Sequence, residues 1–186
     1  MTVPTYLPGK PALAYDRTGQ GPAVIFLHGI GGNRSSWRTQ GEALSGHFTT
    51  IAWDARGYGA SDDYDGPLDF ASFAADLVRL LDHLKIEKAH LVGLSMGARI
   101  LMDFFPNHGE RAATMTLCDC FSGFEATLTP DKQAEFIRLR QKPLLEGKSL
   151  AEMAPALVKS LVGPNCSDDG RAALTESILA LHVESY

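Results

Sequence analysis

The sequence of 186 residues is poor in cysteine and has no long apolar run. Its three cysteines, Cys118, Cys120 and Cys166, are too few and odd in number for a framework of disulfide bonds. No apolar run approaches the roughly 18 residues that a membrane-spanning helix needs. The N-terminus, MTVPTYLPGK, lacks the charged start and the apolar stretch of a signal peptide. These absences predict a cytoplasmic protein that has no membrane as a partner.

Positive charge and metal ligands are also sparse. The formal net charge is −5, and lysine and arginine form no cluster, which argues against nucleic acid as a partner. Cys118 and Cys120 lie two residues apart in a predicted strand, but no further ligands follow at metal-binding spacing. We therefore interpret these cysteines as small apolar residues near a core. The sequence implies neither a metal ion nor an organic cofactor.

Apolar runs alternate with amphipathic stretches up to residue 120. The run AVIFLHG (23–29) is continuously apolar, as expected of a strand that is covered on both faces. In DFASFAADLVRLLDHL (69–84), apolar residues recur at the spacing of one helical face. Further strands are predicted at 11–16, 49–57, 89–94 and 112–119, and further helices at 37–48 and 96–106, the last one stopped by Pro106. This alternation predicts an α/β fold, a mostly parallel sheet with helices on both faces.

After residue 120 the pattern changes, and three helical stretches follow without a strand between them. The first begins at TPD (129–131), the second at the capping box SLAE (149–152), and the third is predicted from about residue 169 to Tyr186. We expect two parts, a core over residues 1–120 and an incomplete helical cap over residues 121–186. Candidates to line an apolar pocket in the cap are Phe121, Phe124, Phe136, Leu139 and Met153.

The stretch GLSMG (93–97) falls between a predicted strand and a predicted helix. This is the setting of a nucleophile elbow, a turn so sharp that its serine adopts a strained backbone conformation. Gly93 and Gly97 leave room for the turn, and the N-terminus of the following helix favours negative charge beside the serine. We identify Ser95 as the candidate nucleophile.

The stretch HGIGG (28–32) also follows a predicted strand. Acyl transfer develops an oxyanion, which two backbone N–H groups must meet at one point. The residue after the nucleophile, Met96, supplies one of them, and Ile30 in this glycine-rich loop is the candidate for the other. We interpret His28 as a structural residue that holds the loop.

The segments AVIFLHGIGG, WDARGYGAS, HLVGLSMGAR and TMTLCD occur in this order, and together they resemble the α/β-hydrolase superfamily. The chain looks most like its enol-lactonase, carboxylesterase and carbon–carbon hydrolase branches, which carry a helical cap. A serine at the elbow, where dehalogenases and epoxide hydrolases place an aspartate, implies an acyl-enzyme ester on Ser95. The expected function is hydrolysis of a small carboxylic ester or lactone. The alternatives are hydrolysis of a carbon–carbon bond in a ring-cleavage product, and a catalytically incomplete or ligand-binding relative.

The serine also needs a histidine to take its proton and a carboxylate to orient that histidine. In the superfamily the acid and the histidine both follow the serine, each after a further strand. We predict no such strands before Tyr186, so we expect the acid and the histidine beyond that residue. The alternative is a triad within the chain that uses Asp119 as the acid and His182 as the base. A sheet without its last strands leaves an edge unpaired, and we expect the isolated chain to be unstable or to aggregate.

Overall fold

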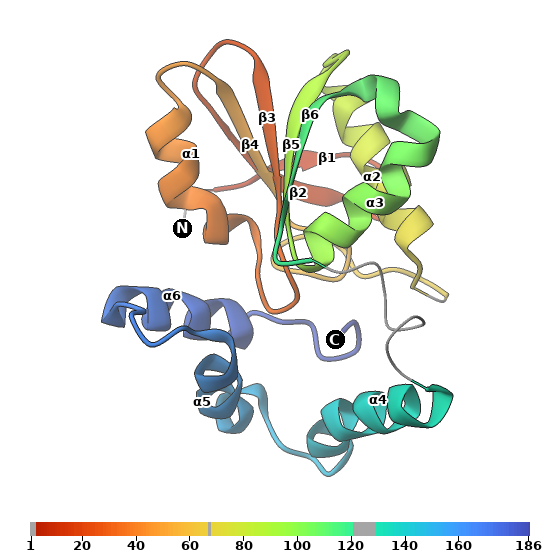
Figure 1. Ribbon diagram of the computed structural model, residues 1–186, viewed down its shortest axis with the longest axis vertical. Helices are drawn as coiled ribbons and strands as arrows, with labels where there is room; N and C mark the ends of the chain where they lie inside the picture. Colours follow the sequence, from red (N-terminus) through yellow and green to blue (C-terminus); the bar gives the residue numbers. More distant parts are fainter. Residues whose placement is uncertain (1–2, 67, 121–128) are drawn as a thin grey trace.

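The computed structural model describes residues 3–66, 68–120 and 129–186, and it shows a sheet above a layer of helices (Figure 1). The sheet has six strands in the order β1-β2-β4-β3-β5-β6. Their bounds are β1 Thr5–Leu7, β2 Leu13–Thr18, β3 Ala23–Leu27, β4 Thr49–Trp53, β5 Ala89–Leu94 and β6 Ala112–Cys118.

Strands β4, β3, β5 and β6 are parallel, and β1 and β2 join one edge of the sheet in antiparallel pairing. Ile25, Ile51 and Leu91 on the three central strands are fully buried, because helices cover both faces. This confirms the predicted α/β fold with a mostly parallel sheet. The sequence did not predict β1, since three residues are too short to show alternation.

Helices pack on both faces of the sheet (Figure 1). The 3-10 turn η1 (Arg34–Trp37) and helix α1 (Arg38–Leu44) lie on one face, while α2 (Phe70–His83) and α3 (Met96–His108) lie together on the other. The apolar side of α2 buries Phe73, Leu77 and Leu80 in the main core. Its N-terminus is capped by Asp69, whose carboxylate accepts the Ser72 N–H at 2.6 Å.

Helix α3 continues past Pro106, which the sequence analysis took as its end. The helix ends at His108, and the short turn η2 (Gly109–Arg111) leads into β6. Pro106 lies in the last turn, where a missing N–H costs a single helical hydrogen bond and no further turn depends on it.

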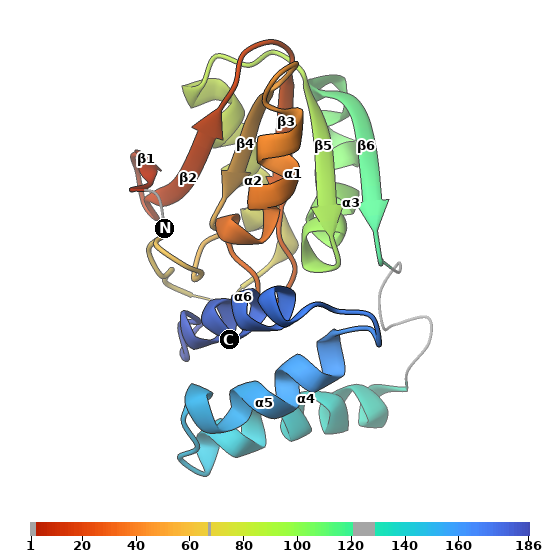
Figure 2. The same cartoon turned by 90° about the vertical axis from the view of Figure 1, so that its left-hand side faces the viewer.

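Over the described residues 129–186, three helices follow the sheet: α4 (Pro130–Leu145), α5 (Leu150–Leu161) and α6 (Asp168–Leu179). They lie below the carboxyl ends of the parallel strands, with α6 nearest to the sheet (Figure 2). None of the helices in the described part of the chain is long and apolar enough to cross a membrane. The division into a core over 1–120 and a cap over 121–186 remains a prediction; here "cap" denotes α4, α5 and α6.

Helix α6 ends at Leu179, whereas the sequence predicted a helix to Tyr186. The chain leaves the helix because Leu181 pairs with Tyr58 in an isolated antiparallel bridge, and Leu181 is buried against the core. This return to the core ties the end of the chain to the loop that follows β4, residues 54–63.

Candidate active site

Ser95 lies in the sharp turn between β5 and α3. Its backbone angles are φ 51° and ψ −107°, outside the regions that most residues other than glycine adopt. The Ser95 N–H donates to the Cys118 carbonyl at 2.9 Å, so the end of β6 anchors the turn from one side. The Ser95 side chain is exposed, and the structure therefore presents its hydroxyl to solvent at the carboxyl edge of the sheet.

Two glycines make this turn possible. A Cβ atom at Gly93 would lie 2.5 Å from the Ala98 nitrogen and from the Gly97 carbonyl group. A Cβ atom at Gly97 would collide with the Leu27 carbonyl oxygen and lie 2.6 Å from its carbon. These neighbours are backbone atoms, which cannot turn away as a flexible side chain would, and so the elbow excludes larger residues at both positions.

The loop 28–32, which we call the oxyanion loop after the role predicted for it from the sequence, lies directly beside the serine. A Cβ atom at Gly29 would be 3.3 Å from the Ser95 Cβ. The Gly32 N–H donates to the Gly29 carbonyl at 3.0 Å and closes a tight turn. Gly31 has φ 81°, the left-handed value that a type II turn requires at its third position. The structure thus brings together the two segments that the sequence analysis singled out.

His28 orients this loop from the core side. Its Nε2 accepts the Ala55 N–H at 3.1 Å, so Nδ1 carries the proton and donates to the Gly29 carbonyl at 2.9 Å. The ring is 1% exposed, and this burial lowers the pKa of His28 and keeps it neutral. With both ring nitrogens engaged, His28 has no nitrogen to offer Ser95.

The Gly29 carbonyl and the Ile30 N–H belong to one planar peptide group, in which the two point in opposite directions. The bonds to Gly29 therefore also set the direction of the Ile30 N–H. Met96 is the first residue of α3, and the N–H groups of a first helical turn have no partner within the helix. Met96 follows Ser95 directly and is buried, whereas Ile30 follows Gly29 in the neighbouring loop and is 57% exposed.

The internal triad candidates Asp119 and His182 are placed differently. Asp119 is exposed directly after β6, with φ 46°. His182 Nδ1 bonds to the Asp63 carboxylate at 2.8 Å, and Nε2 bonds to the Gly59 carbonyl at 3.0 Å. Since both partners are acceptors, the two bonds form together only when the ring is a charged imidazolium. The hydrogen bonds of the described residues do not join Ser95, Asp119 and His182, so the internal triad stays a prediction without a supporting bond.

Partial burial of the His182 ring acts to lower its pKa, but the bonds to Asp63 and Gly59 outweigh it and raise the pKa above the usual value. Bonds from Ser185 and His182 lower the pKa of Asp63. Asp63 and Ser185 were not predicted from the sequence, because contacts across more than a hundred residues leave no local pattern. We call the contact of His182 and Ser185 with Asp63 the C-terminal clasp.

The loop after β4 is held by buried ion pairs. Asp54 is fully buried, accepts the Ala60 N–H at 2.8 Å and pairs with the Arg34 guanidinium. Arg56 forms a two-point pair with the buried Asp76 of α2, at 2.6 and 2.8 Å. These residues support the site and do not reach Ser95.

Cap residues proposed to line an apolar pocket have different environments. Phe121 and Phe124 lie outside the described residues. Met153 is 8% exposed, which buries it within the cap, while Leu139 is 54% exposed. Phe136 carries the Arg140 guanidinium over its ring at 3.3 Å. A pocket formed by these side chains stays a prediction.

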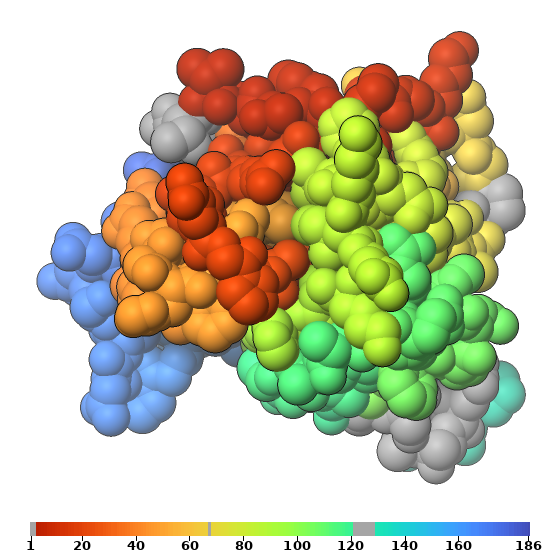
Figure 3. Space-filling view, turned by 90° about the horizontal axis from the view of Figure 1, so that it is seen from above, coloured from red at the N-terminus to blue at the C-terminus, as the bar shows by residue number. Residues whose placement is uncertain are grey.

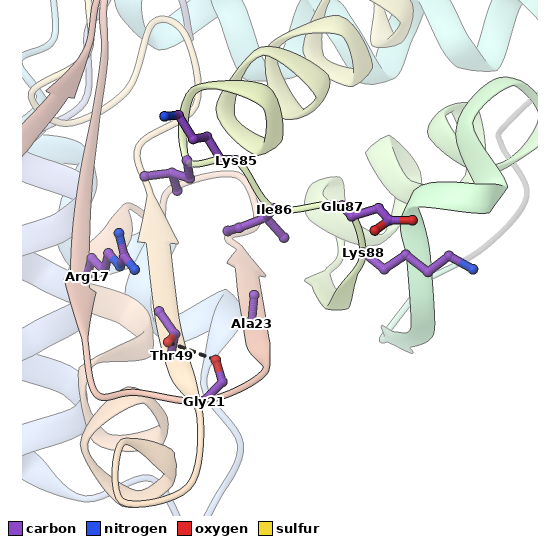
Figure 4. A pocket seen from close by; sticks show the side chains of 9 residues that line it. Arg17, Gly21, Ala23, Thr49, Lys85, Ile86, Glu87 and Lys88 are labelled. Carbon is purple, nitrogen blue, oxygen red and sulfur yellow. Dashed lines mark hydrogen bonds between the residues drawn. The ribbon is translucent and has the colours of Figure 1, made fainter.

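An open hollow of about 460 Å³ lies at the opposite end of the sheet from Ser95, on the side of the core that Figure 3 shows. Arg17, Lys85 and Lys88 line it, but the amino groups of Lys85 and Lys88 point in different directions (Figure 4). The cations do not converge on one point, so we assign no ligand there. Within residues 3–66, 68–120 and 129–186, no three His, Cys, Asp or Glu residues group as metal ligands.

Comparison with known proteins identifies the family to which this fold belongs. A family model described as alpha/beta hydrolase fold matches residues 22–148. The 3-oxoadipate enol-lactonase 2 of Acinetobacter baylyi is 40% identical over 88 residues, 46% of this chain and 33% of that protein. The 2-(acetamidomethylene)succinate hydrolase of Mesorhizobium japonicum is 29% identical over 171 residues, 91% of this chain and 59% of that protein.

A thermophilic esterase from Thermogutta terrifontis has a similar structure, with a TM-score of 0.83 and 28% identity. The match covers 94% of this chain and 64% of the esterase, so the chain spans less than two thirds of each of these three relatives. The family model covers more than half of the chain and includes both the oxyanion loop and the elbow. The chain belongs to the α/β hydrolase fold family.

Proposed function

We propose that Ser95 is the nucleophile of a serine hydrolase that cleaves a small carboxylic ester or lactone. The observation that carries this proposal is the strained, exposed serine at the N-terminus of α3, with the Gly29 backbone beside it. A plain surface turn gains nothing from such strain, whereas a nucleophile needs it to project from the sheet.

In the proposed reaction the Ser95 Oγ attacks the carbonyl carbon of the ester and gives its proton to a general base. The carbonyl oxygen becomes an oxyanion, which accepts hydrogen bonds from the Met96 and Ile30 N–H groups. The carbon–oxygen bond of the ester breaks, the alcohol leaves with a proton, and an acyl-enzyme remains. Water then attacks the acyl group and releases the acid. In a lactone the alcohol stays attached to the acyl chain.

The relatives support this class of substrate. One is named an enol-lactonase and another is an esterase, and an ester bond is the bond that both names imply. Because the chain spans only part of these proteins, the substrate and the activity of the whole protein are proposals. The reaction needs a neutral histidine as the general base. His28 has both ring nitrogens bonded, and His182 would have to give up its bonds to Asp63 and Gly59 to take this role.

A fluorophosphonate probe tests the nucleophile, since it labels only activated serines. We would treat the folded protein at its natural length with the probe, map the labelled peptide by mass spectrometry and follow hydrolysis of p-nitrophenyl acetate. Ser95→Ala is expected to abolish labelling and to lower kcat about a thousand-fold or more. Ser45→Ala is the matched control, because the Ser45 hydroxyl donates only to the Glu42 carbonyl in an exposed turn.

Labelling at Ser95 together with ester hydrolysis would support the proposal. Ester hydrolysis that survives Ser95→Ala would overturn it. Binding of a small ester without turnover or labelling, in protein shown to be folded, would favour the ligand-binding alternative instead.

A further inference from the structure

Helix α6 of the cap makes a direct hydrogen bond to the oxyanion loop. The Ser177 hydroxyl donates to the Gly31 carbonyl at 2.7 Å, across 146 residues of sequence. Ser177 is 5% exposed, so water does not compete for this bond. If this bond broke, the buried Gly31 carbonyl would be left without a donor, which is energetically costly. The bond therefore holds Ser177 and Gly31 in a fixed relative position.

The neighbouring residue reinforces the contact. Ile178 is 1% exposed and belongs to the main core. Its Cγ1 lies 3.8 Å from the position that a Cβ of Gly31 would take. The same turn of α6 thus supplies a hydrogen bond to the loop and places a buried apolar side chain next to Gly31.

The oxyanion loop is consequently held from two sides. From the core side, His28 donates to the Gly29 carbonyl, which also accepts the Gly32 N–H within the loop. From the cap, Ser177 donates to the Gly31 carbonyl. Ile30 lies between these two fixed peptide groups, and its own exposed side chain adds little restraint. Without the bond from the cap, the turn from Gly29 to Gly32 keeps its internal bond and the bond from His28, but the Gly31 carbonyl loses its tie to the rest of the molecule.

We propose that Ser177 is a positioning residue that keeps the Ile30 N–H aligned with Ser95, a role that rests on the proposed function. The oxyanion forms only as the reaction proceeds, so a misaligned Ile30 N–H weakens transition-state binding and leaves substrate binding nearly unchanged. The cap thereby contributes to the chemical step as well as covering the site.

The test removes the hydroxyl in Ser177→Ala and uses Thr175→Val as the matched control. Thr175 lies on the same helix, but its hydroxyl donates at 2.8 Å to the Arg171 carbonyl within α6. With p-nitrophenyl acetate, Ser177→Ala is expected to lower kcat about ten-fold while KM stays within about two-fold. Thr175→Val is expected to leave both constants unchanged.

Hydrogen exchange gives a readout that does not depend on activity. In Ser177→Ala, amides in a peptide covering residues 28–34 are expected to exchange about ten-fold faster, while a peptide from β3 keeps its protection. A thermal melt of the variant shows whether the whole fold has loosened instead.

The outcomes separate the two proposals. A fall in kcat with faster exchange confined to the loop supports the positioning role. Unchanged kcat in an active enzyme, or unchanged exchange of the loop, overturns it, as does faster exchange throughout the molecule. If the wild-type protein shows no hydrolysis that depends on Ser95, the proposed function fails. In that case the hydrogen-exchange rates of residues 28–34 alone show whether Ser177 holds the loop.

Discussion

Gly97 packs closely against the backbone carbonyl group of Leu27, the last residue of β3. Gly97→Ala forces a methyl group against a carbonyl that belongs to the sheet, so α3 or the elbow must move. We expect the free energy of unfolding to fall by about 2–3 kcal/mol and labelling of Ser95 by a fluorophosphonate to slow sharply. Denaturant unfolding and the labelling rate measure the two effects.

Gly46→Ala is the control for this substitution, because nothing lies within 4 Å of the new methyl group. Its unfolding free energy is expected to stay within about 0.5 kcal/mol of the wild-type value. If Gly97→Ala is as harmless as this control, the close approach of α3 to β3 is not a constraint on the elbow.

At the level of elements, the C-terminal clasp joins the segment after α6 to the loop after β4. The charged groups that act on His182 are the carboxylates of Asp63 and Asp54. The pKa of His182 is raised, so the clasp stabilises the fold fully below the unfolded pKa of about 6.5. That contribution is lost as the pH rises through the raised value. Because the pKa of Asp63 is lowered, its contribution is lost only at acidic pH, as the pH falls through that lowered value.

The clasp can be measured at the ring itself. In an NMR titration of the His182 ring protons, we expect a midpoint above about 6.5 in the wild type and a lower midpoint in Asp63→Asn. Ser185→Ala removes the other partner of Asp63 but keeps the carboxylate, so the midpoint is expected to remain raised. A wild-type midpoint at the ordinary value would show that the clasp does not form in solution.

The elements differ in how far the sequence could predict them. β3 was predictable because a strand covered on both faces is apolar throughout. The elbow was predictable because its glycines and serine lie within five consecutive residues, between a mainly apolar strand and an amphipathic helix. The end of α6 was not, since Leu181 and His182 leave the helix for partners far away on the loop after β4. The hydrogen bond between Ser177 and Gly31 could not be predicted for the same reason, since neither residue belongs to a local sequence pattern that indicates a distant partner.

At the scale of the whole molecule, β6 forms one edge of the sheet and pairs with β5 alone among the described residues. Leu117 on this strand is 38% exposed. An edge with free N–H and C=O groups and apolar side chains can pair with another copy. We expect the chain of 186 residues to self-associate and Leu117→Lys to reduce this, as measured by sedimentation velocity over a range of concentrations.

Leu145→Lys is the control for Leu117→Lys, because it makes the same substitution away from the edge strand β6. Leu145 is 82% exposed at the end of α4. It is expected to leave the association unchanged. A wild-type chain that sediments as a monomer at every concentration would argue against pairing through β6.

Helix α6 is fastened by Ser177 and Ile178 to the loop after β3, and the segment that follows it is fastened by Leu181 and His182 to the loop after β4. A molecule arriving over those two strands would have to separate both contacts. Ser95 and Asp119, in contrast, are exposed near the ends of β5 and β6. Among the described residues, α6 therefore closes the approach over β3 and β4 and leaves the approach beside β6, so for the proposed function we expect α6 to act as a fixed wall of the site.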